Sequence, residues 1–132
     1  MQPNRSRGFA AVLLGISLAS APVLAHHGWA GQEEQQTEIS GKVHKPVDLS
    51  GPHATMQIIT EKGQVWDITL APASRTESAG LTSKTFAVGD AVSVRGNRSS
   101  DPKRFEMKTV RVSSGGRNYD VYPDRIKPDQ TK

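Results

Sequence analysis

The sequence predicts a mainly β protein, a five-stranded OB-like Greek-key barrel with one short helix between strands three and four. Short segments that alternate apolar and polar residues recur between residues 37 and 112, separated by glycine and proline turns. One helix signal interrupts them, after the third segment. This order within about 75 residues suits the OB type of barrel. A β-sandwich is the alternative, because periodicity does not reveal strand order.

Five segments show the period-two alternation that half-buried strands produce. In the first segment, Ile39 and Val43 alternate with charged and hydroxyl side chains. In the third, Trp66, Ile68 and Leu70 share one face, which predicts that Trp66 is largely buried. The expected strands lie at 38–44, 54–60, 65–70, 91–95 and 105–112.

The fifth strand departs from strict alternation. Its apolar positions step from Phe105 and Met107 to Val110 and Val112, so the spacing between the two pairs is odd. An extra residue in one strand of an antiparallel pair produces such a step. The sequence therefore predicts a β-bulge within this strand.

A short helix is predicted over residues 74–80. Pro72 stops the third strand, and Ser74 and Glu77 have the spacing of a capping box. Gly80 then supplies the expected helix end. The residues expected to pack this helix onto the sheet are Leu81 and Phe86.

Residues 1–25 are predicted to be a cleavable signal peptide. Arg5 and Arg7 precede an apolar run over 9–19, which is shorter than the roughly 20 residues needed to span a bilayer. Small residues at 23–25 form the cleavage site. We therefore expect a Sec-type route to the periplasm or to secretion, with no stable membrane anchor after cleavage. The remaining predicted parts are an N-terminal arm (26–36), the OB-like domain (37–112) and a flexible polar C-terminal tail (113–132).

The composition and the absence of known catalytic motifs argue against several classes of function. The absence of cysteine excludes disulfides, thiolate metal sites and thiol catalysis. A basic strip is conceivable at Lys103, Arg104, Lys108 and Arg111, but aromatic residues make up only 5% of the chain. Single-stranded nucleic acid needs a basic groove with stacking aromatics, so no nucleic-acid partner is expected. No Ser–His–Asp order, HExxH motif or phosphate-binding glycine loop is present, and we expect a protein that is not an enzyme.

Three segments together resemble one family. They are AHHGWA at 25–30, GPHA at 51–54 and VGDAVSVRG at 88–96. In this order they resemble the domain-of-unknown-function 6152 family of small exported Gram-negative proteins. Two positions depart from the family pattern, since Gly51 stands for the usual asparagine and Thr55 for a frequent aromatic residue. The resemblance implies export and an OB-like fold, and it implies no activity.

The histidines suggest a metal site. Cleavage after Ala25 would free the α-amine of His26, which can chelate one metal ion together with its own ring Nδ1. The ring of His53, or of His27 as an alternate donor, would complete a set of three nitrogen ligands. Such nitrogen donors favour Cu(II), and the affinity order of divalent metals favours copper again. The predicted metal ligands are therefore His26, His53 and His27, with Cu(II) as the expected ion.

A second hypothesis needs no metal. The protein would then be a non-catalytic envelope module that binds a protein or small ligand on the barrel face, with the histidines incidental. His44 lies on the polar face of its strand and is expected to be exposed under either hypothesis. Separation of His26 from His53 in space would favour this second hypothesis.

Overall fold

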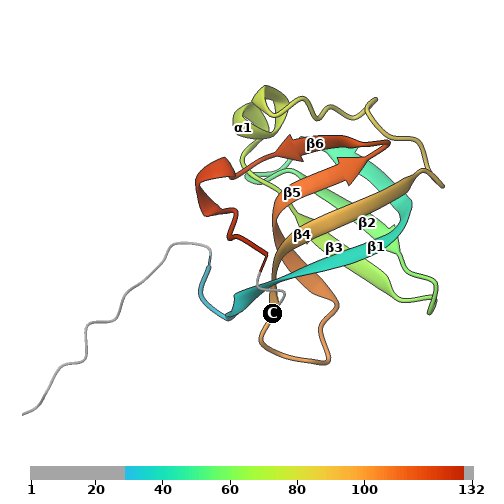
Figure 1. Cartoon of the computed structure of the whole chain (residues 1–132). Helices are drawn as coiled ribbons and strands as arrows, with labels where there is room; N and C mark the ends of the chain where they lie inside the picture. Colours follow the sequence, from blue (N-terminus) through green and yellow to red (C-terminus); the bar gives the residue numbers. More distant parts are fainter. Residues whose placement is uncertain (1–28, 130–132) are drawn as a thin grey trace, which may run out of the picture.

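A computed structural model describes residues 29–129, which fold into strands and two short helices around one barrel (Figure 1). The strands alternate along the chain with turns that contain glycine or proline, as the sequence predicts. In chain order the elements are β1 Gln32–Asp48, β2 Thr55–Ile59, β3 Val65–Thr69, α1 Ala73–Ser78, β4 Ala91–Ser99, β5 Glu106–Ser114, β6 Arg117–Asp120 and the 3₁₀-helix η1 Pro123–Arg125.

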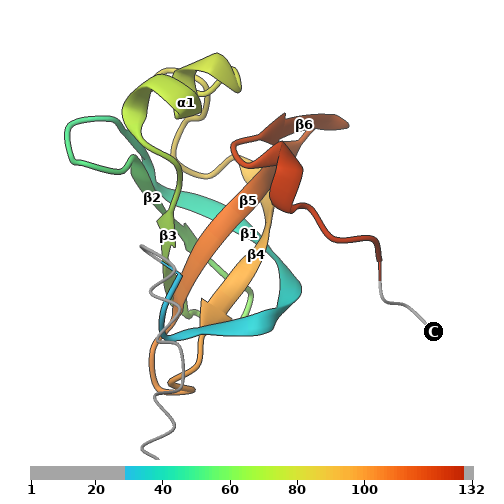
Figure 2. The ribbon, with the colours of Figure 1, turned by 90° about the vertical axis from the view of Figure 1, so that its left-hand side faces the viewer.

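The strands close into a barrel of the OB type, which confirms the predicted fold class. Their order is β3-β2-β1-β4-β5-β6, and a parallel pairing of β3 with β5, at Ile68 and Met107, closes the ring. The long strand β1 pairs with β4 up to Lys42 and with β2 from Lys42 onward. Helix α1 lies between β3 and β4 in the chain and at one end of the barrel in space (Figures 1 and 2).

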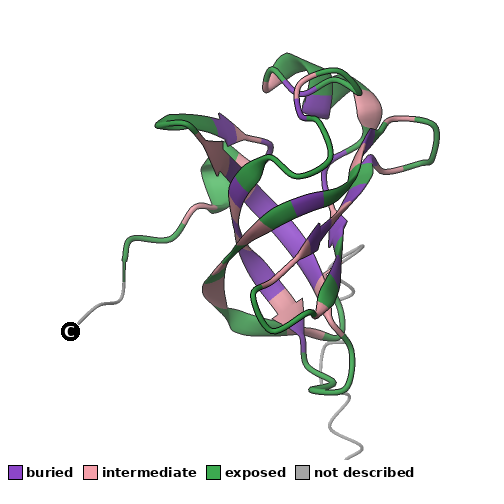
Figure 3. Ribbon diagram, turned by 90° about the vertical axis from the view of Figure 1, so that its right-hand side faces the viewer, coloured by how far each residue is buried: buried purple, intermediate pink, exposed green. Residues whose placement is uncertain are grey.

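The apolar faces of the strands meet inside the barrel. Buried segments of the strands are interrupted by exposed or intermediate ones (Figure 3). Trp66 is 3% exposed, so its predicted burial is confirmed. Its ring packs against Phe105 with 5.3 Å between ring centroids. The predicted helix-packing residues Leu81 and Phe86 are also buried in this core.

The predicted bulge in β5 is confirmed. Arg95 of β4 pairs with Arg111, but the next β4 residue, Gly96, pairs with Thr109, so Val110 is the additional residue on β5. The two backbones come very close here, because a Cβ atom on Gly96 would lie 2.1 Å from the carbonyl oxygen of Lys108. The bulge therefore requires glycine at position 96.

Helix α1 begins differently from the prediction and ends as predicted. The capping-box prediction is wrong: Pro72 is the N-cap, without a side-chain hydrogen bond. The carbonyl of Pro72 accepts the amide hydrogen of Thr76 at 3.0 Å, which starts the helix before Ser74 can act as a cap. At the other end, Gly80 has φ +98°, and its amide donates to the carbonyl of Glu77. This left-handed glycine after the last turn is a Schellman-type end.

The structure corrects the predicted limits of the domain. β1 begins at Gln32, inside the predicted arm, because residues 32–36 extend the pairing with β4. β5 continues to Ser114 and β6 follows, inside the predicted flexible tail. Tyr119 and Val121 alternate with polar residues and are buried, which ties this segment to the core. Neither helix within residues 29–129 has the length and apolar character needed to cross a membrane.

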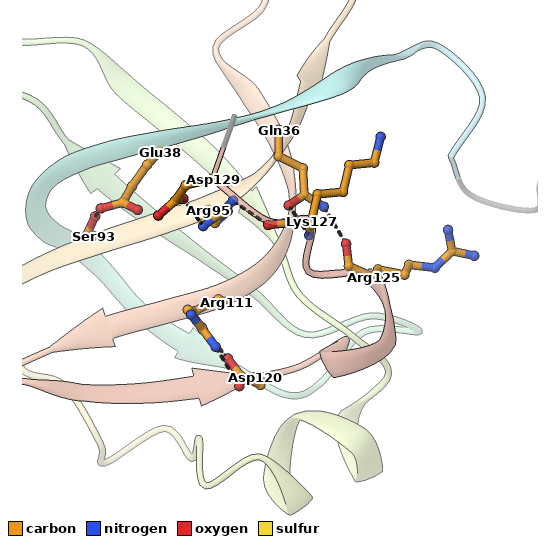
Figure 4. Close-up of polar contacts among 9 residues, drawn as sticks. All are labelled: Gln36, Glu38, Ser93, Arg95, Arg111, Asp120, Arg125, Lys127 and Asp129. Atoms are coloured by element: carbon orange, nitrogen blue, oxygen red, sulfur yellow. Dashed lines mark hydrogen bonds and ion pairs between the residues drawn. The ribbon is translucent and has the colours of Figure 1, made fainter. Parts of the chain in front are cut away.

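Polar contacts hold the segment after β6 against β1 and β4 (Figure 4). The Gln36 side chain donates to the carbonyl oxygen of Arg125 at 2.6 Å and accepts from the amide of Lys127 at 3.1 Å. The Arg95 guanidinium contacts the Asp129 carboxylate at 2.7 Å and the Lys127 carbonyl at 2.6 Å. The beginning and the end of the described chain therefore lie side by side.

Candidate functional site

Two aromatic rings meet where the chain ends converge. Trp29 lies in the turn before β1, and its carbonyl accepts the amide hydrogen of Gln32. Tyr122 lies between β6 and η1 and is half-buried. The two rings are packed edge to face with 5.4 Å between centroids, an arrangement that aromatic pairs favour. This pair joins the N-terminal and C-terminal segments.

Three cationic side chains surround the aromatic pair. The ammonium of Lys108 lies 5.3 Å from the centre of the Trp29 ring, and the guanidinium of Arg125 lies 4.6 Å from it. The guanidinium of Arg75, from α1, lies 5.3 Å from the centre of the Tyr122 ring. These distances are within the range of cation–π attraction. We call these five residues the cation–aromatic cluster.

The cluster carries no paired carboxylate within residues 29–129. The ion pairs there involve Arg95, Arg104 and Arg111, and none involves a cation of the cluster. Arg111 instead forms a bidentate contact with Asp120, which holds the pKa of that carboxyl below its usual value. Because Arg111 is paired with Asp120, it adds no free positive charge to the basic strip considered in the sequence.

Lys108 has an unusual position for a lysine. It is 8% exposed and is the third residue of β5, beside the bulge. Burial lowers the pKa of its ammonium, and the charge of Arg125 lowers it further. Lysine is rarely buried without an acidic partner, so this side chain creates an unusual positive potential next to the Trp29 ring.

His53 lies in the loop between β1 and β2 and faces the same potential. It is half-buried, and this burial, followed by the charge of Lys108, lowers the pKa of its ring below 6.5. The ring is therefore neutral at pH 7 and keeps a nitrogen lone pair available. Within the described chain, no side-chain hydrogen bond involves the ring of His53. His44 is exposed on β1, as predicted.

Of the three predicted metal ligands, only His53 lies within the described residues. His53 is placed as described above, whereas His26 and His27 lie outside the described residues. Between residues 29 and 129, no three histidine or carboxylate side chains are grouped to hold a metal ion. Trp29 follows His26 by three residues, and three residues span at most roughly 11 Å. Trp29 lies against Lys108, and the charge of Lys108 also acts on His53, so Trp29 and His53 lie in the same part of the molecule.

The cluster itself was not predicted as a site. The sequence places Trp29 in the predicted arm and Lys108 in the basic strip, and it does not indicate that the two meet. Arg75, Tyr122 and Arg125 come from three separate places in the sequence. The one sequence signal for the cluster is that tyrosines and basic residues lie close together after the fifth strand. This signal does not indicate which aromatic ring a basic side chain would contact.

The shifted pKa of His53 leads to a testable pH dependence. An unfolded histidine takes up a proton near pH 6.5, whereas folded His53 takes it up at lower pH. The unfolded state therefore binds more protons just below pH 6.5, and acidification through this window lowers the free energy of unfolding. We expect His53→Gln to remove this part of the loss, as measured by urea unfolding between about pH 8 and pH 5. His44→Gln is the matched control, and an unchanged pH slope in His53→Gln would contradict the assignment.

A hollow lies on the barrel face, and none of the cluster residues lines it. It has a volume of about 820 Å³, and its lining includes Thr60, Trp66 and Arg98. The Arg98 guanidinium lies 5.0 Å from the centre of the Trp66 ring. In each of these three residues a buried polar atom has no hydrogen-bond partner within the described chain: Thr60 Oγ1, Trp66 Nε1 and Arg98 Nε. The hollow thus has the size of a small-molecule site.

The closed barrel, the short helix and the converging chain ends define a small protein of the OB-barrel class. The chain belongs to DUF6152, a family of unknown function whose model matches residues 14–108. The predicted family is thereby confirmed. No protein of curated function matches the chain.

Among solved structures, the apo form of TiaS, a tRNAIle2 agmatidine synthetase, is similar to part of the chain. The TM-score is 0.43 with 19% sequence identity over 59% of this chain. The matched part makes up 17% of TiaS, so the chain spans about a sixth of that protein's length.

Proposed function

We propose that the protein is exported through the signal peptide 1–25 and binds one Cu(II) ion at its mature N-terminus. The α-amine and ring of His26 and the ring of His53 are the ligands, with His27 as the alternate donor. In this proposal the protein binds the ion and does not use it for catalysis. The observation that carries the proposal is the shared neighbour of Trp29 and His53, the buried Lys108. This shared neighbour supports a ligand role for the neutral imidazole of His53 close to the predicted chain start.

The ionisation of His53 supports a role as a ligand. A metal ion competes with protons for imidazole nitrogen. Because burial lowers the pKa of His53, protons do not occupy this ring at neutral pH. The terminal amine, with an ordinary pKa near 7.7–8.0, is then the first ligand to be protonated as the pH falls. Copper affinity is therefore expected to decrease below about pH 8 before His53 itself takes up a proton.

The positive charges nearby act in the opposite direction. Lys108 and Arg125 repel a divalent cation, and the repulsion is stronger at a half-buried site than in bulk water. The affinity must therefore come from the nitrogen donors and the chelate ring, and not from electrostatic attraction. Nitrogen ligands suit copper in this respect, whereas Mg²⁺ and Ca²⁺ depend on anionic oxygen.

The test is a calorimetric Cu(II) titration of protein purified from the periplasm, after intact mass has established a start at His26. The native start is expected to bind one Cu(II). A variant with an extra methionine before His26 should bind more than about tenfold more weakly, because the amine becomes an amide and the chelate is lost. His53→Ala should also bind more weakly, and His44→Ala is the matched control that should not change.

Two outcomes would overturn the copper proposal. One is equal affinity in the native and methionine-extended proteins, which would show that the terminal amine is not a ligand. The other is a mature protein that does not begin at His26. In both cases the second candidate gains support: an envelope module that binds a protein or small ligand on the barrel face. The unpaired polar atoms around the hollow at Trp66 and Arg98 favour that candidate.

A further inference from the structure

The cation–aromatic cluster contains three cations, and none of them forms an ion pair with a described acidic side chain. Lys108, Arg125 and Arg75 come from β5, from η1 and from α1, and each lies against Trp29 or Tyr122. Glu33, Glu34 and Asp124 lie nearby, because they line a hollow of about 600 Å³ together with Trp29 and Arg125. None of their carboxylates is ion-paired with a cluster cation, so the N–H donors of the three cations are not used by these carboxylates.

The surrounding structure fixes the backbone positions of Arg125 and Lys108. The backbone of Arg125 is fixed by the Gln36 side chain, and Figure 4 shows its guanidinium extending away from those polar contacts. Lys108 is fixed by the pairing of β5 with β3 and β4. Like charges held together in this way repel one another before any ligand arrives. A site that is already assembled loses little further conformational freedom when it binds.

A purely structural role explains the cluster poorly. Joining the chain ends would require only the Trp29–Tyr122 contact, and an apolar side chain in place of Lys108 would fill the same space. A lysine that buries its apolar stem keeps its charged head toward solvent, and the Lys108 ammonium is not among the described polar atoms that are buried without a partner. Lys108 is more than nine-tenths buried, forms no ion pair within the described residues, and lies against the Trp29 ring. An ammonium in this position is suited to meet a negative charge supplied from outside the chain.

We propose that the cation–aromatic cluster is a binding site for a small polyvalent oxyanion of the phosphate type. The ammonium of Lys108 and the guanidinium groups of Arg75 and Arg125 provide charge-assisted hydrogen bonds, which are the strong kind. Trp29 and Tyr122 keep the three cations oriented. The same phosphate chemistry occurs in the free anion and in phospholipid headgroups, and the proposal concerns the free anion.

The experiment is a calorimetric titration with inorganic phosphate at constant ionic strength, with chloride as the compensating ion. Native protein is expected to bind phosphate, and Lys108→Met should weaken the affinity about tenfold through loss of one charge-assisted contact. Methionine keeps the length and the apolar stem of lysine, so the variant should stay folded, as checked by circular dichroism. Arg125→Gln and Arg75→Gln should weaken binding as well. Lys62→Met, in the exposed turn between β2 and β3, is the matched control.

Three outcomes would overturn the proposal. They are no phosphate binding by the native protein, equal weakening in Lys62→Met and Lys108→Met, and binding to vesicles of anionic phospholipid with no binding of free phosphate. The last result would assign the cluster to a membrane surface. A higher melting temperature in phosphate than in chloride, absent in Lys108→Met, is a second supporting measurement.

The anion site and the copper site can fail independently of each other. Removal of the Lys108 charge should tighten Cu(II) binding, because it removes a repulsion, and weaken phosphate binding, because it removes an attraction. His53→Ala should weaken Cu(II) binding and leave phosphate binding unchanged. Tighter Cu(II) binding together with weaker phosphate binding in Lys108→Met would support both proposals. Weaker binding of both ligands would contradict the copper proposal, and tighter binding of both would contradict the phosphate proposal.

Discussion

Replacing Trp66 by alanine is expected to lower the free energy of unfolding by about 3–5 kcal/mol. The ring is 3% exposed, and it packs against Phe105 and the Arg98 guanidinium. Alanine would lose this buried area and leave a cavity in the barrel. The loss is a large share of the roughly 5–15 kcal/mol that stabilises a typical domain. Urea unfolding followed by circular dichroism would measure it.

The matched control for this variant is Lys62→Ala, in the exposed turn that joins β2 to β3. Its effect is expected to stay within about 0.5 kcal/mol, as for most surface substitutions. Should the two variants shift the unfolding midpoint equally, Trp66 would not be part of the barrel core.

Replacing Gly96 by alanine is expected to lower the free energy of unfolding by about 3 kcal/mol or more. The new Cβ would lie 2.1 Å from the carbonyl oxygen of Lys108 and 2.7 Å from the Cα of Thr109. Both are backbone atoms of the bulged strand, so no side-chain rotation relieves the clash. Strands β4 and β5 would have to separate at the bulge, next to Lys108. The variant should therefore also weaken the binding of phosphate.

Gly51→Ala is the control for this second variant. Gly51 is exposed, and a Cβ there would meet the carbonyl of His53 at 3.2 Å, a much milder contact. We expect a decrease below about 1 kcal/mol in chemical denaturation. Comparable losses in Gly96→Ala and Gly51→Ala would mean that the two strands are not in close contact at the bulge.

The sequence predicted the features of the fold that local patterns determine. Alternation placed Trp66 on the inner face, and the odd step from Met107 to Val110 revealed the bulge. Gly80 ended the helix where predicted, because a left-handed residue after the last turn favours glycine. These features depend on residues close together in the chain, so the sequence pattern alone was sufficient.

The errors occurred where distant segments decide the outcome. Residues 32–36 are polar and look like an arm, yet they form strand because the far end of β4 offers backbone partners. The segment after Ser114 has few apolar residues, and it is ordered by the alternating burial of Tyr119 and Val121 against the barrel. Residues 32–36 carry no apolar alternation of their own, and in the later segment the alternation is limited to Tyr119 and Val121.

The candidate site was less predictable than the fold. The environment of His53 depends on Lys108, which is 55 residues away in the numbering of the chain. A lysine within a strand ordinarily indicates the solvent face, and the bulge next to it changes which positions are buried. The three cations of the cluster converge only after the barrel closes, so a list of basic residues does not reveal their common location.

Strand β6 also affects how separate copies of the protein behave toward one another. The parallel contact with β3 covers only the first part of β5, at Glu106–Lys108. Beyond it, the outer edge of β5 would present unpaired backbone groups, and β6 covers this edge at Arg111–Ser114. An uncovered edge of this kind can recruit a strand from a neighbouring molecule and begin aggregation. The edge strand is then the short β6, which offers few backbone groups and exposes Arg117 and Asn118. A short, polar edge of this kind lowers the tendency of crowded copies of the protein to associate.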